Sequence, residues 1–198
     1  MIPLGVFSTE ALDVPDVEAG VSAKKVCIID TGYSYDHEDL PKRGVSGSAS
    51  GEADWAVDGN GHGTHVAGII AALEGNGKGV VGVTRSGNLN FYIFYIVKVF
   101  DDFGGWIWSS GLMDAVEKCA DAGANVINLS FGRIGQQTKF ESDTFDDLLY
   151  KRNVLVVTAS GNTGKNDTFF LASYDAVVSV GAVDSKTKQI GDFSTYQG

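Results

Sequence analysis

The chain of 198 residues lacks any long apolar run, and it is poor in cysteine, in proline and in basic side chains. A membrane-spanning helix needs about 20 consecutive apolar residues, and no run in this sequence approaches that length. We therefore expect no spanning segment. The first residues, MIPLGVFSTEALD, also lack the basic region followed by an apolar region that defines a secretory signal.

Only two cysteines, Cys27 and Cys119, are present. Two thiols do not make the disulfide framework that holds small secreted domains together. Cys27 lies in the apolar run VCIID, and Cys119 lies in a segment with a helical pattern. We predict that both are buried and free, because an unpaired cysteine behaves as a small hydrophobic side chain.

Basic residues are outnumbered by acidic ones. There are 15 Lys and Arg residues against 25 Asp and Glu residues, which gives a formal net charge of −10. Such a chain repels phosphate backbones and anionic lipids, so neither nucleic acid nor a membrane surface is an expected partner. The length suits one domain with a sizeable core, and the 26 glycines predict many tight turns.

Short apolar runs alternate with helical patterns along the chain. The five runs lie at 25–30, 91–100, 125–130, 153–160 and 176–184. The three helical patterns lie at 62–75, 109–123 and 142–153. Nearly continuous apolarity indicates strands that are covered on both faces. We therefore predict an α/β fold with an open, mostly parallel sheet and helices on both faces.

The run at 91–96, FYIFYI, is a tandem triplet. Strand side chains alternate with a period of two, so three extra residues would turn every later side chain to the other face. Either the added triplet bulges out of the strand, or it lengthens the beginning of the strand.

Polar residues follow the ends of three predicted strands, where ligands bind in open α/β sheets. Asp30 closes a buried strand, and a carboxylate in that place needs a cationic or N–H partner. His62, at the start of a predicted helix, is a suitable partner. Asn162 follows a third strand, and its amide is suited to donate to a developing oxyanion. An acid, a histidine and an amide donor form most of an acyl-transfer site.

The sequence resembles the subtilisin-like serine peptidases, or subtilases, over nearly its whole length. The block HGTHVAG is specific by itself, and the other blocks follow in the family's order. They are VCIIDTGYSYDHEDL (26–40), DGNGHGTHVAGIIAAL (58–73), GVVGV (79–83), VKVFDDFGG (97–105), ANVINLSFG (124–132), VLVVTASGN (154–162), ASYDAVVSVGAVDS (172–185) and IGDFSTYQG (190–198).

The resemblance implies a role for each matched residue. Asp30 corresponds to the buried acid that fixes the imidazole tautomer, His62 to the general base and later acid, and Asn162 to the oxyanion-hole donor. The implied substrate-binding residues are Gly104, Gly105, Trp106, Ser130, Phe131, Gly132, Ala159, Ser160 and Gly161. The first six would bind the peptide as an added strand. Residues 158–161 and 130–132 would form the walls of the pocket that receives the substrate side chain before the cut bond. Phe131 replaces the more usual leucine.

The resemblance requires no cofactor, although some family members bind calcium at the positions of Asp39 and Asn76. Carboxylate and amide oxygens are suitable calcium ligands. Lys78 in the same loop argues instead for a solvated loop without a metal. Both interpretations remain open at this point.

The family's nucleophilic serine lies in a block similar to GTSMA, which does not occur in this chain. No serine lies in that context or in a G-x-S-x-G context; Ser160 belongs to the pocket wall and Ser194 to a segment that precedes the missing block. The resemblance therefore implies that 1–198 is a partial catalytic domain, incomplete at its C-terminal end and inactive by itself. We also expect marginal stability and an exposed apolar sheet surface.

The family resemblance implies a serine endopeptidase that acts on peptides or proteins as a monomer, is made with a propeptide and is exported. One alternative is a truncated, inactive peptide-binding module. Another is a metal site built on His62 and His65. The second is weak, because zinc sites usually need three or more ligands and His37 is the only other histidine. We predict that His65 is a buried structural residue.

Overall fold

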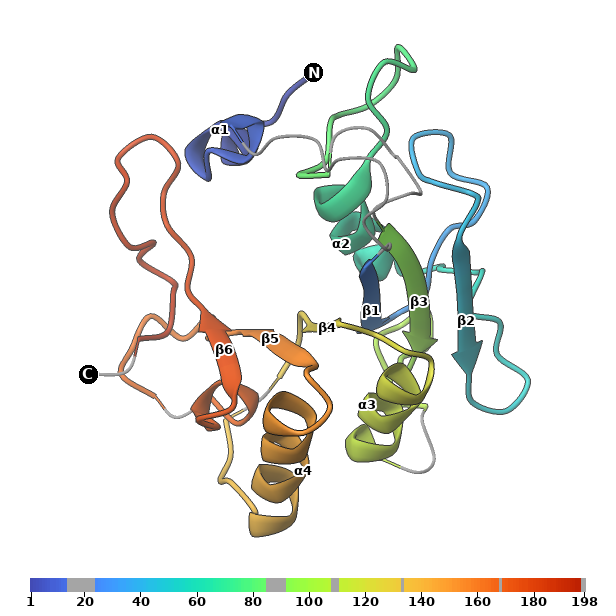
Figure 1. The fold of residues 1–198 in the computed structure, drawn as a ribbon. Coiled ribbons are helices and arrows are strands. Elements are labelled where there is room, and N and C mark those ends of the chain that lie inside the picture. The colour runs from blue at the N-terminus through green and yellow to red at the C-terminus, as the bar shows by residue number, and fades with distance from the viewer. Residues whose placement is uncertain (14–23, 85–91, 108–110, 133, 168, 197–198) are drawn as a thin grey trace.

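The computed structural model describes residues 1–13, 24–84, 92–107, 111–132, 134–167 and 169–196. Its centre is a sheet of six strands in the order β2-β3-β1-β4-β5-β6, and all five pairings are parallel (Figure 1). The strands are β1 (Lys24–Asp30), β2 (Val45–Ala49), β3 (Tyr92–Lys98), β4 (Val126–Leu129), β5 (Leu155–Ala159) and β6 (Val177–Val180). The predicted α/β fold with a parallel sheet is confirmed.

Helices lie on both faces of the sheet. The α-helices are α1 (Leu4–Ser8), α2 (His62–Ala71), α3 (Leu112–Asp121) and α4 (Lys139–Tyr150), and the short 3-10 helices are η1 (Ala11–Asp13) and η2 (Leu171–Ser173). None of the helices in the described part of the chain is long and apolar enough to cross a bilayer. The start predicted at 109 for the second long helix lies outside the described residues.

Two hydrophobic clusters follow from the alternation of side chains along β1. Cys27 and Ile29 face the larger cluster, which α3 and α4 complete, whereas Val26 and Ile28 face the smaller cluster under α2. Because β1 lies in the middle of the sheet, both of its faces are covered. This explains the nearly continuous apolarity of the run at 25–30.

One helix boundary and one strand differ from the sequence-based expectations for local reasons. The structure begins α4 at Lys139, three residues before the predicted start, because the Thr138 side chain accepts a hydrogen bond from the backbone N–H of Glu141. The strand β2, with the sequence VSGSA, was not predicted, since it has no apolar run. It forms the edge of the sheet beside β3.

The tandem triplet lengthens β3 and does not bulge out. From Tyr92, which pairs with Lys24, to Lys98, which pairs with Asp30, the register between β3 and β1 is unbroken. Phe91 lies outside the described residues.

One face of β5 and β6 is not covered by any described helix. Leu155, Val178 and Val180 point to that face and are 36%, 44% and 51% exposed. An exposed apolar sheet surface was expected, and the described residues have one.

Cys27 and Cys119 form a disulfide, so the prediction of two free thiols is wrong. Both residues are fully buried, as predicted. Packing of α3 on β1 brings their Cα atoms to 5.6 Å, which is within the usual range for a disulfide. The two residues are 92 positions apart in the chain, so no local pattern indicates the pairing.

This disulfide should stabilise the fold measurably. It closes a loop of more than 90 residues, so replacing both cysteines by alanine should lower the free energy of unfolding by about 2–5 kcal/mol. Denaturant titration of the variant and of the unreduced protein measures the difference. Alkylation of both thiols in the denatured, unreduced protein would show that the bond does not form.

Candidate active site

Asp30 and His62 meet at the carboxyl end of β1. Asp30 is the last residue of β1, and His62 is the first residue of α2. The Nδ1 atom of His62 lies 2.7 Å from Oδ1 of Asp30, which also accepts the backbone N–H of Thr31 at 2.7 Å. The Asp30 side chain is 1% exposed, whereas that of His62 is 50% exposed. The pair thus has a buried acid and a base that solvent and ligands can reach.

The arrangement selects one tautomer of His62. A carboxylate can only accept a hydrogen bond, so Nδ1 carries the proton and Nε2 keeps a free lone pair. No hydrogen bond to Nε2 occurs within the described part of the chain. Nε2 is therefore available to take a proton from a reacting group.

Burial dominates the ionisation of Asp30. Desolvation raises the pKa of its carboxyl group above the ordinary value, although the hydrogen bonds from His62 and Thr31 act in the opposite direction. Its Oδ2 atom is buried and has no hydrogen-bond partner among the described residues. A carboxylate held in this way interacts strongly with a positive charge on the neighbouring imidazole, because little water screens it.

Glycine allows α2 to approach β1 closely enough for this contact. A Cβ atom on Gly63 would lie 2.3 Å from the carbonyl oxygen of Gly32 and 3.1 Å from Cβ of Asp30. Any larger residue at position 63 would therefore push His62 away from Asp30. The N-cap residue of the helix is Gly61, whose φ of +88° favours glycine.

Asp58 holds the loop before α2. Its Oδ1 accepts the backbone N–H of Gly61 at 2.9 Å, and its Oδ2 accepts the backbone N–H and the hydroxyl of Thr64 at 2.9 and 2.5 Å. Burial alone would raise the pKa of Asp58, but these hydrogen bonds outweigh it and hold the pKa below the ordinary value.

Lys98 anchors the strand end that carries Asp30. This role was not predicted from the sequence. It pairs with Asp30 in the register of β3 and β1 and is only 4% exposed. Its Nζ donates to the carbonyl oxygens of Thr31 and Val57 at 2.5 and 3.1 Å, and it lies 3.0 Å from Oδ1 of Asp102. Lys98 therefore ties the end of β1 to the loop that leads to α2. A lysine inside the apolar run VKVF was the available signal.

Asn162 lies at the same edge of the sheet as the acid–base pair. It follows β5, and β1, β4 and β5 are adjacent parallel strands. Asn162 is exposed, so its amide is accessible to a ligand. At the end of β4, the Ser130 hydroxyl donates to Oδ1 of Asn128 at 2.8 Å.

The predicted substrate segments meet through aromatic contacts. The rings of Trp106 and Phe131 have centroids 6.2 Å apart, and Phe100 packs edge-on against both at 5.3 and 5.0 Å. A cavity of about 580 Å³ lies beside these rings. Gly104 and Gly105 form the exposed turn before Trp106. The structure thus brings the segment around Trp106 next to the segment at 130–132.

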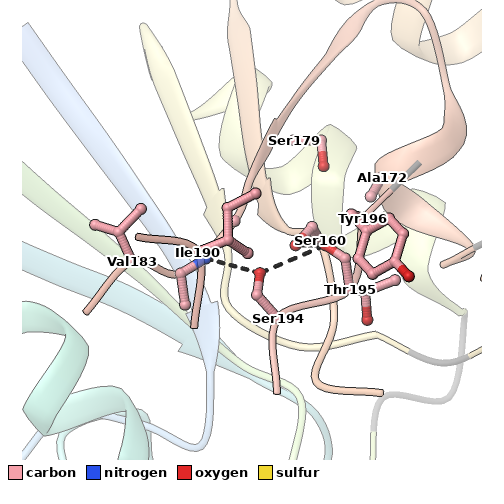
Figure 2. A pocket seen from close by; sticks show the side chains of 10 residues that line it. Ser160, Ala172, Ser179, Val183, Ile190, Ser194, Thr195 and Tyr196 are labelled. Atoms are coloured by element: carbon pink, nitrogen blue, oxygen red, sulfur yellow. Dashed lines mark hydrogen bonds between the residues drawn. The ribbon is translucent and has the colours of Figure 1, made fainter. Parts of the chain in front are cut away.

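Ser160 and Ser194 line a second cavity, of about 420 Å³, near the end of the described chain (Figure 2). The hydroxyl of Ser160 donates to the carbonyl oxygen of Thr195 at 2.9 Å. The hydroxyl of Ser194 accepts the backbone N–H of Ala182 at 2.9 Å, and this side chain is 1% exposed. Neither serine contacts His62, so both hydroxyls serve the local fold.

The predicted pocket wall at 159–161 faces Gly132 across a gap. In the structure this gap contains the ring of Phe169, which the sequence analysis did not consider. The space beside Gly161 is therefore occupied, and the role of Ala159, Ser160 and Gly161 as a pocket wall stays a prediction.

Asp39 and Asn76, the pair considered for calcium, are in contact. Oδ1 of Asp39 accepts a hydrogen bond from Nδ2 of Asn76 at 2.7 Å, and Oδ2 accepts the backbone N–H of Val80 at 2.9 Å. Asn76 directs its own oxygen to the backbone N–H of Lys78. Calcium requires oxygen ligands, whereas N–H groups surround this carboxylate. The residues as arranged do not fit a calcium ion.

His65 is exposed, so the prediction of a buried structural histidine is wrong. It lies on α2 three residues after His62 and lines a cavity together with residues of α1. No group of three or more His, Cys, Asp or Glu side chains within the described ranges could hold a metal ion. The alternative of a metal site on His62 and His65 therefore lacks a third ligand there.

Comparison with known proteins identifies similar sequences and folds. A family model described as the subtilase family matches residues 22–198. The chain is 37% identical to a thermophilic serine proteinase of Bacillus sp. (strain AK1) over 182 residues, which cover 91% of this chain and 43% of that protein. It is 39% identical to subtilisin DY of Bacillus licheniformis over 175 residues, which cover 86% of this chain and 60% of that protein.

A solved structure agrees with these sequence matches. The psychrophilic subtilisin-like protease Apa1 from the Antarctic psychrotroph Pseudoalteromonas sp. AS-11 has a TM-score of 0.87 and 40% sequence identity. The alignment covers 99% of this chain and 44% of that chain. The chain thus spans about half the length of the relatives that it matches.

The raised pKa of Asp30 predicts a pH dependence of stability. Its contribution is fully present below the unfolded pKa of about 3.9 and is lost as the pH rises through the folded pKa. The free energy of unfolding of the wild type minus that of Asp30→Asn should therefore fall as the pH rises above about 4. Denaturant titrations of both proteins over this pH range measure the difference. A difference that rises with pH would mean that His62 and Thr31 outweigh desolvation.

The contacts of Asp39 predict a response to calcium and to mutation. The midpoint of thermal unfolding should agree within about 1 °C in excess calcium and in chelator, because N–H donors, and not oxygen ligands, surround the Asp39 carboxylate. Asp39→Asn should lower the free energy of unfolding by about 1–3 kcal/mol, since two N–H groups in partly buried hydrogen bonds lose a charged acceptor. A midpoint several degrees higher with calcium would contradict this account.

Proposed function

This chain belongs to the subtilase family, and from that premise we propose that it contributes the acid, the base and the oxyanion donor of a serine endopeptidase. The hydrogen bond of 2.7 Å between Nδ1 of His62 and Oδ1 of Asp30 carries this proposal, because the exposed imidazole is thereby oriented with Nε2 free. Such a pair serves to activate an alcohol for attack on a carbonyl carbon.

The proposed reaction is peptide-bond hydrolysis through an acyl-enzyme. Nε2 of His62 takes the proton of a serine hydroxyl as its oxygen attacks the carbonyl carbon. The imidazolium that forms is stabilised by the carboxylate of Asp30, and it then gives the proton to the leaving amine. The side-chain amide of Asn162 donates to the oxyanion of the tetrahedral intermediate. Water then cleaves the acyl-enzyme by the same proton transfers.

We assign the serine nucleophile to the GTSMA-like block of the family, which is absent from residues 1–198. The hydroxyls of Ser160 and Ser194 are engaged with backbone groups, which supports this assignment. Among the described residues, no serine hydroxyl is hydrogen-bonded to Nε2 of His62.

The substrate is a peptide or protein that binds as an extended strand. Two segments are available on either side of it: the exposed Gly104, Gly105 and Trp106 on one side, and the partly exposed 130–132 on the other. Backbone pairing with both segments holds the peptide regardless of its sequence, and pockets between them read its side chains.

We further propose that the protein acts as a monomer outside the cell, after a propeptide has assisted its folding. The disulfide between Cys27 and Cys119 supports an oxidising compartment. The alternative, a peptide-binding module without hydrolysis, would use the same segments.

An active-site probe tests the proposed function. A fluorophosphonate should label the full-length natural product at one serine, and peptide mapping should place that serine outside residues 1–198. His62→Ala should abolish labelling and lower kcat by about 10⁴-fold or more, as is known for subtilisin itself. His65→Ala, on the same helix and also exposed, is the matched control and should retain activity.

The oxyanion role of Asn162 has its own expected outcome. Asn162→Ala should lower kcat by about 10²–10³-fold with little change in KM, the magnitude known for the corresponding change in subtilisin. A peptide that binds but is never cut, together with no probe labelling, would favour the binding module over the peptidase.

A further inference from the structure

The ring of Phe169 is wedged between two glycines that belong to different strand ends. A Cβ atom on Gly132 would lie 2.4 Å from Cε1 of Phe169, and one on Gly161 would lie 2.7 Å from Cδ2. Cδ1 and Cε1 are on one edge of the ring, and Cδ2 and Cε2 are on the other. The ring therefore spans the gap from the end of β4 to the end of β5.

The backbone holds the ring in this place. Phe169 forms an antiparallel bridge with Ile134, two residues beyond Gly132. The next residue, Phe170, is buried in the larger hydrophobic cluster and packs edge-on against Tyr174 at 5.8 Å. The bridge to Ile134 and the burial of Phe170 both hold position 169 in the fold, so the ring is part of the wall and not a free loop side chain.

The gap is the place that the substrate side chain before the cut bond must approach. An oxyanion donor lies about 3 Å from the carbonyl oxygen, so the Cα of that residue lies within about 5–6 Å of the donor. The proposed donor is Asn162, the residue that follows Gly161. The side chain attached to that Cα therefore enters beside Gly161, between β5 and the segment at 130–132.

Glycine at both walls keeps the gap open for one side chain. Gly161 has φ = +109°, a conformation that favours glycine, and a Cβ on either Gly132 or Gly161 would collide with the ring. The space that two missing side chains leave is thus filled by one aromatic ring from the chain itself. A substrate ring that entered beside Gly161 would have to compete with Phe169 for this space.

We propose that Phe169 determines the specificity of the site by restricting the residue before the cut bond to small side chains such as glycine, alanine or serine. The inference rests on the proposed peptidase function, because it uses Asn162 as the oxyanion donor. It assigns the selection of small residues to one side chain outside the acid–base pair.

Hydrolysis by the full-length natural product tests the proposal. Peptides that differ only in the residue before the cut bond should be cleaved with kcat/KM at least tenfold higher for alanine than for phenylalanine. Phe169→Ala should raise kcat/KM for the phenylalanine peptide at least tenfold and change the value for the alanine peptide little. Equal or preferred cleavage after phenylalanine by the wild type would overturn the proposal, since the ring would then move aside.

Two further variants separate specificity from stability. Phe140→Ala removes an aromatic ring that is 70% exposed on α4 and should leave the preference unchanged. Phe169→Leu keeps an apolar side chain in the gap, so it should fold if Phe169→Ala does not, and it should shift the preference part of the way. An unchanged preference in a folded Phe169 variant would refute the inference.

Peptide binding distinguishes this inference from the proposed function. If no peptide is hydrolysed, the proposed peptidase function fails. Equilibrium binding of two tetrapeptides, one ending in alanine and one in phenylalanine, then tests whether Phe169 restricts the side chain that enters the gap. The wild type should bind the alanine peptide more tightly, and Phe169→Ala should reverse the order. Equal affinities of both proteins for both peptides would count against any role of Phe169.

Discussion

The burial of one carboxylate, that of Asp30, is the constraint on which the site depends. A charged group that is removed from water is unfavourable unless donors surround it. Here one oxygen accepts two N–H groups, from Thr31 and His62, and the other has no partner among the described residues. Burial therefore raises the pKa of Asp30, and the same buried carboxylate orients the imidazole of His62 through a hydrogen bond. Lys98 and Gly63 serve the same end, by anchoring the strand end and by allowing α2 to come close.

Glycine acts at this edge of the sheet in two ways. At Gly63 it allows two elements to touch, so that acid and base are within hydrogen-bonding distance. At Gly132 and Gly161 it leaves a gap between the ends of two strands, and a ring from elsewhere in the chain enters that gap. The first use concerns the contact between the acid and the base. The second concerns which substrates fit, and here the decisive atoms belong to Phe169.

The hydrophobic clusters and the disulfide hold the strand ends in position. β1 contributes alternate side chains to both clusters, so its last residue, Asp30, is fixed from both faces of the sheet. The bond between Cys27 and Cys119 joins the same strand to α3. By contrast, β5 and β6 keep one apolar face uncovered by the described helices. The part of the sheet that is covered on both faces is thus the part that carries the acid and the base.

The sequence by itself determined the fold class and predicted that Asp30, His62 and Asn162 lie at one edge of the sheet. These depend on local patterns: continuous apolar runs for covered strands, and polar residues such as Asp30 and Asn162 directly after them. Only the tertiary structure decided the pairing of the cysteines, the exposure of His65, the N–H partners of Asp39 and the place of Phe169. Each of these involves groups far apart in the chain or a position on a packed surface. Their outcome depends on how the strands and helices pack, which no short stretch of sequence encodes.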